Sequence, residues 1–323
     1  MKEIMENVPC PLCGSLDQKL LFLRRDHTHL VSDEAFRIVR CRDCGFVFVN
    51  PRPTAQGIHD YYPPEFYSVH LTPGQLLEET KDRNAAKLAL LRDIPPGRLL
   101  DIGCQKGEFL FEAHKVGWEV HGVEYSSKPP NLFDLPIFHG EVANAPYPDG
   151  YFDLITMWAV LEHVHDPLAM MRQIKRLLKP SGRALILIPN FNSIPGRLMR
   201  HDDVPRHLVM FTPRTFRNMS ERAGFEVVRT VFSDAIFSGS TRGFLNFLYK
   251  LARGEKIDEI LAQNRDPRRW VEFSNHVRGK ESEFMLKVDR FDIRMSPYLD
   301  SLMNMLGLGF IMTVEIKPVL SPA

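Results

Sequence analysis

The segment from Arg98 to Phe232 alternates short apolar runs with amphipathic stretches, and this alternation limits the possible folds more than any other feature. The apolar runs are RLLDIG, WEVHGVE, LPIFHG, FDLITMW, RALILIP and EVVRTVF. Between several of them lie helical patterns, namely EFLFEAHKVG, DPLAMMRQIKRLLKPSG and TPRTFRNMSERAGF. Apolar strands that alternate with amphipathic helices predict a mostly parallel sheet with helices on both faces. The expected fold class is therefore α/β.

Proline, glycine and changes of pattern divide the chain into four parts. Residues 1–50 are expected to form a small cysteine-containing module, and residues 51–95 a helical connector rich in Tyr and Pro. The α/β domain is predicted over 96–233 and 308–323, because FIMTVEIKP resembles one more strand that must rejoin the sheet. Residues 234–307 would then form a helical insertion before that last strand, as a substrate lid or an interface.

Four of the five cysteines form two pairs with the spacing of a metal site. Cys10 and Cys13 form the first pair, Cys41 and Cys44 the second, and a glycine follows each pair. Two such turns present four thiolates in the tetrahedral arrangement that Zn²⁺ prefers. We therefore predict structural zinc with no open coordination position. The alternative of two disulfides fits poorly with a chain that shows no signal peptide.

The overall composition is that of an ordinary globular protein. Hydrophobic residues make up 44% and charged residues 25%, and the formal net charge is +1. The balance predicts no strongly acidic or basic partner. The apolar run from Met305 to Val314 is too short to span a bilayer, and MKEIMENVPC lacks the apolar core of a signal peptide. We expect a cytoplasmic protein, and the pattern leaves the number of subunits open.

The stretch LLDIGCQKGEFL places an acid and two glycines, Asp101, Gly103 and Gly107, between the first strand and its helix. Ligands of open α/β sheets bind beyond the carboxyl ends of the strands, and glycines allow close approach to the main chain. The spacing fits neither the dinucleotide fingerprint nor a Walker A loop. Glu124 ends the next strand, where a carboxylate can accept hydrogen bonds from both ribose hydroxyls. A nucleoside ligand is therefore predicted.

Four motifs together resemble class I S-adenosylmethionine-dependent methyltransferases, which have a Rossmann-like sheet. These motifs are DIGCQKGEF, VHGVE, GEVANAPYPDGYFDLITMWAVLEHVHDP and LKPSGRALILIPN. The likeness implies S-adenosyl-L-methionine as cofactor. It places the acid and glycine loop beside the methionine part of the cofactor, and it implies binding roles for Asp101, Gly103, Gly107, Glu124, Tyr125, Glu141, Val142 and Trp158. Gln105 replaces a frequent glycine, and Glu141 replaces the usual Asp beside adenine. Trp158 fits the core as well as the pocket wall.

The N-terminal region resembles that of bacterial methyltransferases with a zinc ribbon, through CPLCG, CRDCGFVFVNPRP and YYP. Some relatives of this kind are sugar C-methyltransferases, which are expected to carry a further C-terminal domain. The resemblance favours a small-molecule acceptor, such as a sugar or a carrier-linked metabolite.

Histidines supply the candidate proton acceptors for methyl transfer. LEHVHDP and VPRHLVMFTP place His163, His165 and His207 after the fourth and fifth strands, and imidazole titrates near neutral pH. We predict His163 and His207 as catalytic, whereas His165 is expected to make loop hydrogen bonds. A metal site from His201, Asp202, Asp203 and His207 is conceivable on ligand type, but solvated charges are favoured.

Two other functions compete with this prediction. An RNA methyltransferase is one, but residues 1–50 carry seven basic and seven acidic side chains, and residues 240–300 carry twelve and ten. Neither segment is the one-sided basic surface that phosphate binding requires. A non-catalytic zinc-containing scaffold is the other, although a scaffold needs no carboxylate at a ribose position.

Overall fold

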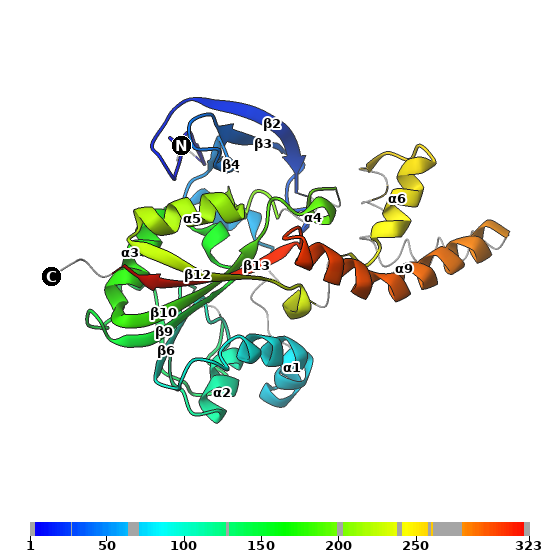
Figure 1. The fold of residues 1–323 in the computed structure, drawn as a ribbon. Helices are drawn as coiled ribbons and strands as arrows, with labels where there is room; N and C mark the ends of the chain where they lie inside the picture. The colour runs from blue at the N-terminus through cyan, green and yellow to red at the C-terminus, as the bar shows by residue number, and fades with distance from the viewer. Residues whose placement is uncertain are drawn as a thin grey trace.

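A seven-stranded sheet forms the centre of the molecule (Figure 1). The computed structural model describes residues 4–26, 28–63, 71–126, 129–198, 203–237, 241–257, 260 and 280–319, with residues 280–286 described by backbone alone. Within these ranges the strand order is β12-β13-β10-β9-β6-β7-β8. The strands are β6 Arg98–Ile102, β7 Glu119–Glu124, β8 Ile137–His139, β9 Phe152–Trp158, β10 Leu178–Pro189, β12 Phe225–Phe232 and β13 Ile311–Pro318.

The sheet is parallel except for its last strand in sequence. β6 pairs in parallel with β7 and β9, and β9 pairs in parallel with β10. β13 runs antiparallel between β10 and β12. The strand in FIMTVEIKP thus returns to the sheet after the insertion, which confirms the predicted α/β class and the mostly parallel sheet.

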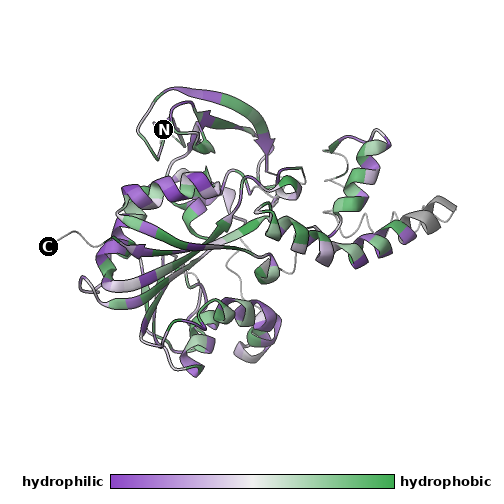
Figure 2. Cartoon of the chain, in the orientation of Figure 1, coloured by the Kyte–Doolittle hydropathy of each residue, from purple (hydrophilic) through white to green (hydrophobic). Residues whose placement is uncertain are grey.

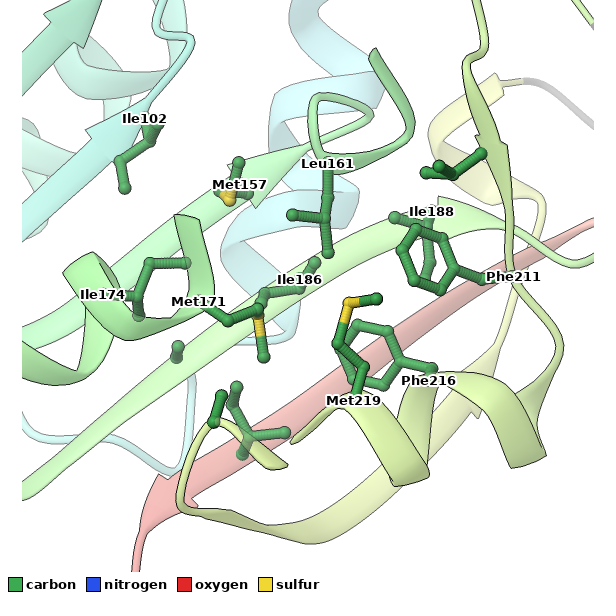
Figure 3. Close-up of a cluster of buried hydrophobic side chains, with 14 of the residues drawn as sticks. Ile102, Met157, Leu161, Met171, Ile174, Ile186, Ile188, Phe211, Phe216 and Met219 are labelled. Atoms are coloured by element: carbon green, nitrogen blue, oxygen red, sulfur yellow. The ribbon is translucent and has the colours of Figure 1, made fainter. Parts of the chain in front are cut away.

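Helices cover both faces of the sheet, because each face carries its own set of buried side chains. On one face, α1 (Pro73–Ala89) and α2 (Glu108–Lys115) lie over a cluster that includes Leu99, Leu110 and Leu185. On the other face, α3 (Pro167–Leu177) and α5 (Pro213–Arg222) contribute Met171, Ile174, Phe216 and Met219 (Figure 3). Figure 2 shows hydrophobic colouring along the strands between these two layers.

Three of these helices begin with the same local signal. Thr72, Asp166 and Thr212 each precede a proline, and each side chain accepts a hydrogen bond from the backbone N–H three residues later. Proline suits the first helical position because that N–H needs no helical partner. The sequence therefore fixes where α1, α3 and α5 start.

The N-terminal residues form a separate sheet that packs against the large one. Its strand order is β11-β4-β3-β2, and a short pair β1–β5 lies beside it. The strands are β1 Met5–Glu6, β2 Gln18–Arg25, β3 Ala35–Cys41, β4 Val47–Val49, β5 Arg52–Pro53 and β11 Val209–Met210. Cys10, Cys41, Phe46 and Phe48 belong to the same buried cluster as the α3 and α5 side chains. The N-terminal sheet and the large sheet therefore share a core.

Two helices of the insertion are described, and they lie to one side of the sheet (Figure 1). They are α6 (Phe244–Ala252) and α9 (Lys280–Met305). Asp292 of α9 accepts backbone N–H groups at the start of α6, from Gly243 and from Leu245 at 2.7 Å. Within the described part of the chain, no helix has the length and apolarity that a membrane crossing would need. The domain limits predicted above stay predictions.

Candidate active site

The loop between β6 and α2 has a backbone that only glycine accommodates at two positions. Gly103 has φ +77°, and a Cβ there would lie 2.5 Å from the side chain of Val160. Gly107 has φ +85° and caps α2. Both angles fall in the left-handed region, which glycine adopts at little cost. The two predicted glycines therefore shape the loop, and Gly103 brings it against the segment that follows β9.

Two predicted carboxylates lie at the carboxyl ends of β6 and β7. Asp101 is buried and accepts a hydrogen bond of 2.6 Å from the Thr156 hydroxyl. Burial raises the pKa of Asp101 to about 7, although Lys87 and the Thr156 hydrogen bond oppose this. Glu124 is buried and accepts the backbone N–H groups of Gln105 and Ser126, each at 3.0 Å. These two hydrogen bonds hold the glycine loop against Glu124, so the Glu124 carboxylate lies directly beside the loop.

Two further charged groups, Lys87 and Glu108, lie near Asp101, and neither was predicted from the sequence. Lys87 comes from α1 and is buried, and its Nζ lies 5.2 Å from the ring centre of Phe109 and 5.3 Å from that of Trp158. Burial lowers the pKa of Lys87, while the charges of Asp101 and Glu108 oppose the shift. Glu108 Oε2 and Trp158 Nε1 are buried, and neither has a hydrogen-bond partner in the part of the chain that the structure describes. Lys87 lies on a helix that was predicted to be a connector, and no sequence pattern marked it as a site residue.

The pocket therefore combines a buried ammonium group with buried carboxyl groups at the floor of a glycine loop. An α-amino acid group carries the complementary charges, since its carboxylate can face Lys87 and its ammonium group can face Asp101 and Glu108. The unpartnered Glu108 and Trp158 atoms would gain partners from such a ligand. The described residues thus fit the methionine end and the ribose of S-adenosylmethionine.

The residues predicted beside adenine lie along the same sheet edge. β8 pairs with β7, with His139 opposite Glu124, and Glu141 and Val142 follow two residues later. Val142 is buried, whereas Glu141 is exposed. The Tyr125 side chain is 60% exposed and stacks on His59, with ring centres 6.3 Å apart. Their predicted roles stay predictions.

The two predicted catalytic histidines come together after β9 and before β11. His163 ends the short helix η4 (Leu161–His163), and the ring centres of His163 and His207 lie 4.6 Å apart. Burial lowers the pKa of His163 to about 3 and also lowers that of His207, so both imidazoles are neutral at pH 7. Tyr62 Oη lies 3.3 Å from His163 Nδ1. His165 makes the expected kind of loop contact, with Nε2 3.1 Å from the Pro53 carbonyl oxygen.

Glu162 lies beside these histidines and was not predicted. Its side chain is buried, and its Oε1 lies 4.0 Å from His207 Nε2. Burial raises the pKa of Glu162 to about 8. Glu162 and His207 line a cavity of about 30 Å³ together with Asn190 and Phe191. The adjacent acid and histidine in LEHVHDP, Glu162 and His163, are the sequence signal that could have identified this acid.

The ligand atoms of Glu162, His163 and His207 lie within 4.8 Å of one another, which is close enough for a shared metal ion. The tautomer of His207 opposes this use of the group. His207 Nδ1 accepts the Asp203 N–H at 3.4 Å, which leaves the ring proton on Nε2. His201 and Asp202 lie outside the described residues.

The four predicted zinc ligands do come together. Cys10 Sγ lies 3.5 Å from Cys44 Sγ, Cys13 Sγ lies 3.5 Å from Cys41 Sγ, and all four sulfur atoms lie within 4.8 Å. A tetrahedral zinc ion with Zn–S bonds of about 2.3 Å sets neighbouring sulfurs about 3.8 Å apart. None of these thiols forms a disulfide. The cluster is compatible with zinc.

The sheet order, the glycine loop and the charged pocket define a class I S-adenosylmethionine-dependent methyltransferase. Residues 76–230, just under half of the chain, match the family of methyltransferase domains. This match confirms the resemblance and the enzyme class that the sequence motifs implied. It begins inside α1, so it includes Lys87.

Two relatives of low identity are described as demethylmenaquinone methyltransferases. The protein of Listeria welshimeri is 25% identical over 175 residues, which cover 47% of this chain and 74% of the relative. The protein of Listeria innocua is 27% identical over 122 residues, which cover 34% of this chain and 52% of the relative. The chain therefore spans only about half the length of the second relative.

A solved structure described as a SAM dependent methyltransferase from Archaeoglobus fulgidus is 21% identical. It covers 75% of this chain and 97% of its own, with a TM-score of 0.46. Another structure, from Thermotoga maritima, is described as a possible histamine N-methyltransferase. It is 24% identical and covers 50% of this chain and 80% of its own, with a TM-score of 0.40.

Proposed function

We propose that the protein transfers the methyl group of S-adenosylmethionine to a small-molecule acceptor, of the class of sugars or carrier-linked metabolites. The observation that carries the cofactor assignment is the buried set Lys87, Asp101 and Glu108 beneath the glycine loop, with Glu124 at the next strand end. The bound cofactor supplies a methyl group on a positively charged sulfur, which is already an activated leaving group.

The residues of the chain then act by binding and orienting. Lys87 would hold the carboxylate of the methionine part, and Asp101 and Glu108 its ammonium group. Glu124 would accept the ribose hydroxyls, while Tyr125, Glu141, Val142 and Trp158 would border the adenine and the pocket wall. Alignment of the methyl group with the acceptor contributes up to about 7–11 kcal/mol when geometry is ideal.

The acceptor side is proposed at the segment after β9, where His163 and His207 meet. The cavity lined by Glu162 and His207 also contains the aromatic rings of Phe191 and Phe310. A partly aromatic cavity of about 30 Å³ can take one functional group of a small organic molecule, but not a nucleic-acid backbone. The names of the relatives also point to small molecules, although their low identity gives no particular acceptor.

We further propose that the four-cysteine cluster holds one structural zinc ion. Its ligands would all come from the protein, so the ion would have no open position for chemistry. Four unpaired thiols need a reducing compartment, which favours a cytoplasmic location.

Calorimetric titration of S-adenosylmethionine, with NAD as the control ligand, tests the cofactor assignment. Wild type is expected to bind S-adenosylmethionine with micromolar affinity and not NAD. Lys87→Met and Glu124→Gln should each weaken binding by about 1–3 kcal/mol, because each removes a charged partner of the ligand. Glu226→Gln, a matched change at an exposed ion pair with Lys317, should leave affinity unchanged. Equal affinity in all four proteins, or no binding at all, would contradict the assignment.

A further inference from the structure

The side chain of Glu162 ends in a buried carboxyl group. The residue is 1% exposed, and neither Oε1 nor Oε2 has a hydrogen-bond partner among the described residues. A buried polar group left in this state destabilises the fold, and such groups are rare in native proteins. The Glu162 carboxyl group is therefore available to accept hydrogen bonds from a ligand.

This carboxyl group lies on the same sheet edge as the cofactor pocket. Glu162 belongs to η4, directly after β9, and Val160 of the same segment contacts the glycine loop at Gly103. The Glu162 carbonyl oxygen accepts the Leu208 N–H at 2.8 Å, which holds His207 beside it. The cavity between them, of about 30 Å³, is large enough for one water-sized group.

The geometry of the pair suits a hydroxyl group. Glu162 Oε1 and His207 Nε2 are 4.0 Å apart, and one oxygen atom can lie about 2.8 Å from both. The Asp203 N–H points at His207 Nδ1, so the ring proton of a neutral His207 is on Nε2 and can be donated. A hydroxyl oxygen can accept that hydrogen bond while its own proton is donated to Glu162. An amine can also donate a proton to Glu162. Its nitrogen has only one lone pair, however, so the hydrogen bond from His207 would occupy the electrons that must attack the methyl group.

We propose that the methyl acceptor presents a hydroxyl group between Glu162 and His207, and that Glu162 accepts the hydroxyl proton during transfer. This rests on the proposed function, because it takes the methyl group from S-adenosylmethionine. The new oxygen–carbon bond forms as the carbon–sulfur bond breaks, and the electron pair of that bond stays on the sulfur as a neutral thioether. The proton passes from the hydroxyl oxygen to a Glu162 oxygen, so charge is conserved.

The charges around Glu162 come from several elements. His163 and His207 are neutral, Asp203 is paired with Arg206, and the guanidinium groups of Arg24 from β2 and Arg197 from α4 (Ile194–Leu198) line the cavity. Burial raises the pKa of Glu162 to about 8, and Asp203 adds to this rise. Glu162 accepts a proton only when ionised, so the rate should increase with pH up to about 8.

The test uses the full chain loaded with methyl-labelled S-adenosylmethionine and matched pairs of probes. Phenol and catechol are the hydroxyl probes, aniline and 1,2-diaminobenzene are their amine counterparts, and glucose is a sugar probe. Products are identified by mass spectrometry and NMR. The proteins are wild type, Glu162→Gln, His207→Gln, His207→Leu and the control Glu226→Gln, and S-adenosylmethionine affinity is measured for each by calorimetry.

The proposal predicts labelled methyl on oxygen in wild type and in Glu226→Gln. Glu162→Gln should lower the rate by at least about 100-fold with unchanged cofactor affinity. His207→Gln, which keeps an N–H donor, should retain more activity than His207→Leu. Methyl on nitrogen or carbon, an unchanged rate in Glu162→Gln, or no transfer to any hydroxyl probe by protein that binds the cofactor would overturn the proposal. Loss of cofactor binding in wild type would instead overturn the proposed function beneath it.

Discussion

At the scale of single residues, the groups that matter most are charged side chains placed in apolar surroundings. Lys87, Asp101 and Glu162 are each buried. Burial removes the charged form of each side chain from water, which costs free energy that the surrounding residues offset only in part. Their pKa values move accordingly: that of the lysine falls, and those of the two acids rise. Groups of this kind concentrate at functional sites, where a ligand supplies the missing partner.

Glu162 therefore gives the fold a pH dependence of known sign. Its pKa rises from the ordinary 4.5 to about 8 in the folded protein, so the folded state binds the proton more tightly than the unfolded state. The stabilising contribution of the protonated form is complete below pH 4.5 and is lost as pH rises toward 8. We expect Glu162→Gln, which mimics the neutral acid, to match wild type near pH 4.5 and to exceed it at pH 8, by up to about 5 kcal/mol.

Urea denaturation of the ligand-free protein at several pH values measures this difference. Asp101 titrates in both proteins, so its contribution cancels when the two curves are subtracted. A difference between Glu162→Gln and wild type that stays constant from pH 4.5 to 8 would show that Glu162 is not held in its protonated form.

At the scale of elements, Arg206 joins the end of β2 to the segment that precedes β11. This guanidinium group is fully buried and donates to Asp26, at the end of β2, and to Asp203, each at 2.6 Å. Burial alone would raise the pKa of Asp26, but the hydrogen bonds from Arg206 and from backbone N–H groups hold it at about 2. The pair thus joins segments 180 residues apart in the sequence.

Arg206→Met should lower the free energy of unfolding by about 3–5 kcal/mol, because it leaves the buried Asp26 and Asp203 without their cation. Asp26→Asn in the same chain should restore part of the loss. The control is Arg42→Gln, since Arg42 and Asp17 form an exposed pair at 3.1 Å whose removal costs about 1 kcal/mol or less. Urea denaturation measures all three variants. Equal effects of Arg206→Met and Arg42→Gln would refute the structural role.

The sequence predicts elements well where the signal is local. Thr-Pro and Asp-Pro pairs mark the starts of α1, α3 and α5, and apolar runs mark the strands of the large sheet. Contacts between distant segments leave no such local signal. Lys87 reaches Trp158 from a helix that was predicted to be a connector. Glu162 is notable because its oxygens have no hydrogen-bond partner among the residues that the structure describes. The candidate site was therefore predictable in its loop and strand ends, but not in its buried charges.

At the scale of the whole molecule, the cysteine-containing module packs beside the proposed acceptor side. β4 pairs with β11, directly after His207, and Arg222 of α5 donates to the Leu12 carbonyl oxygen at 2.9 Å. Tyr62 contacts His163, and Arg24 of β2 lines the cavity beside Glu162. The cofactor pocket, by contrast, is built from α1, α2 and the ends of β6 and β7.

This division predicts separate consequences for losing the metal. Wild type should hold about one zinc ion per chain, measured by atomic emission, and Cys13→Ser/Cys41→Ser should hold almost none. The variant should unfold at a lower temperature, because the shared core around Cys10 and Phe46 loses the metal that supports it.

Below that temperature, S-adenosylmethionine affinity should be retained, since none of the residues proposed to bind the cofactor comes from the module. Methyl transfer should fall, because His163 and His207 lose their packing. Cys104→Ser is the control for the zinc content alone, since Cys104 lies outside the four-cysteine cluster but within the glycine loop. Zinc-free wild type that unfolds at the same temperature as the native protein would show that these four thiols hold no structural metal.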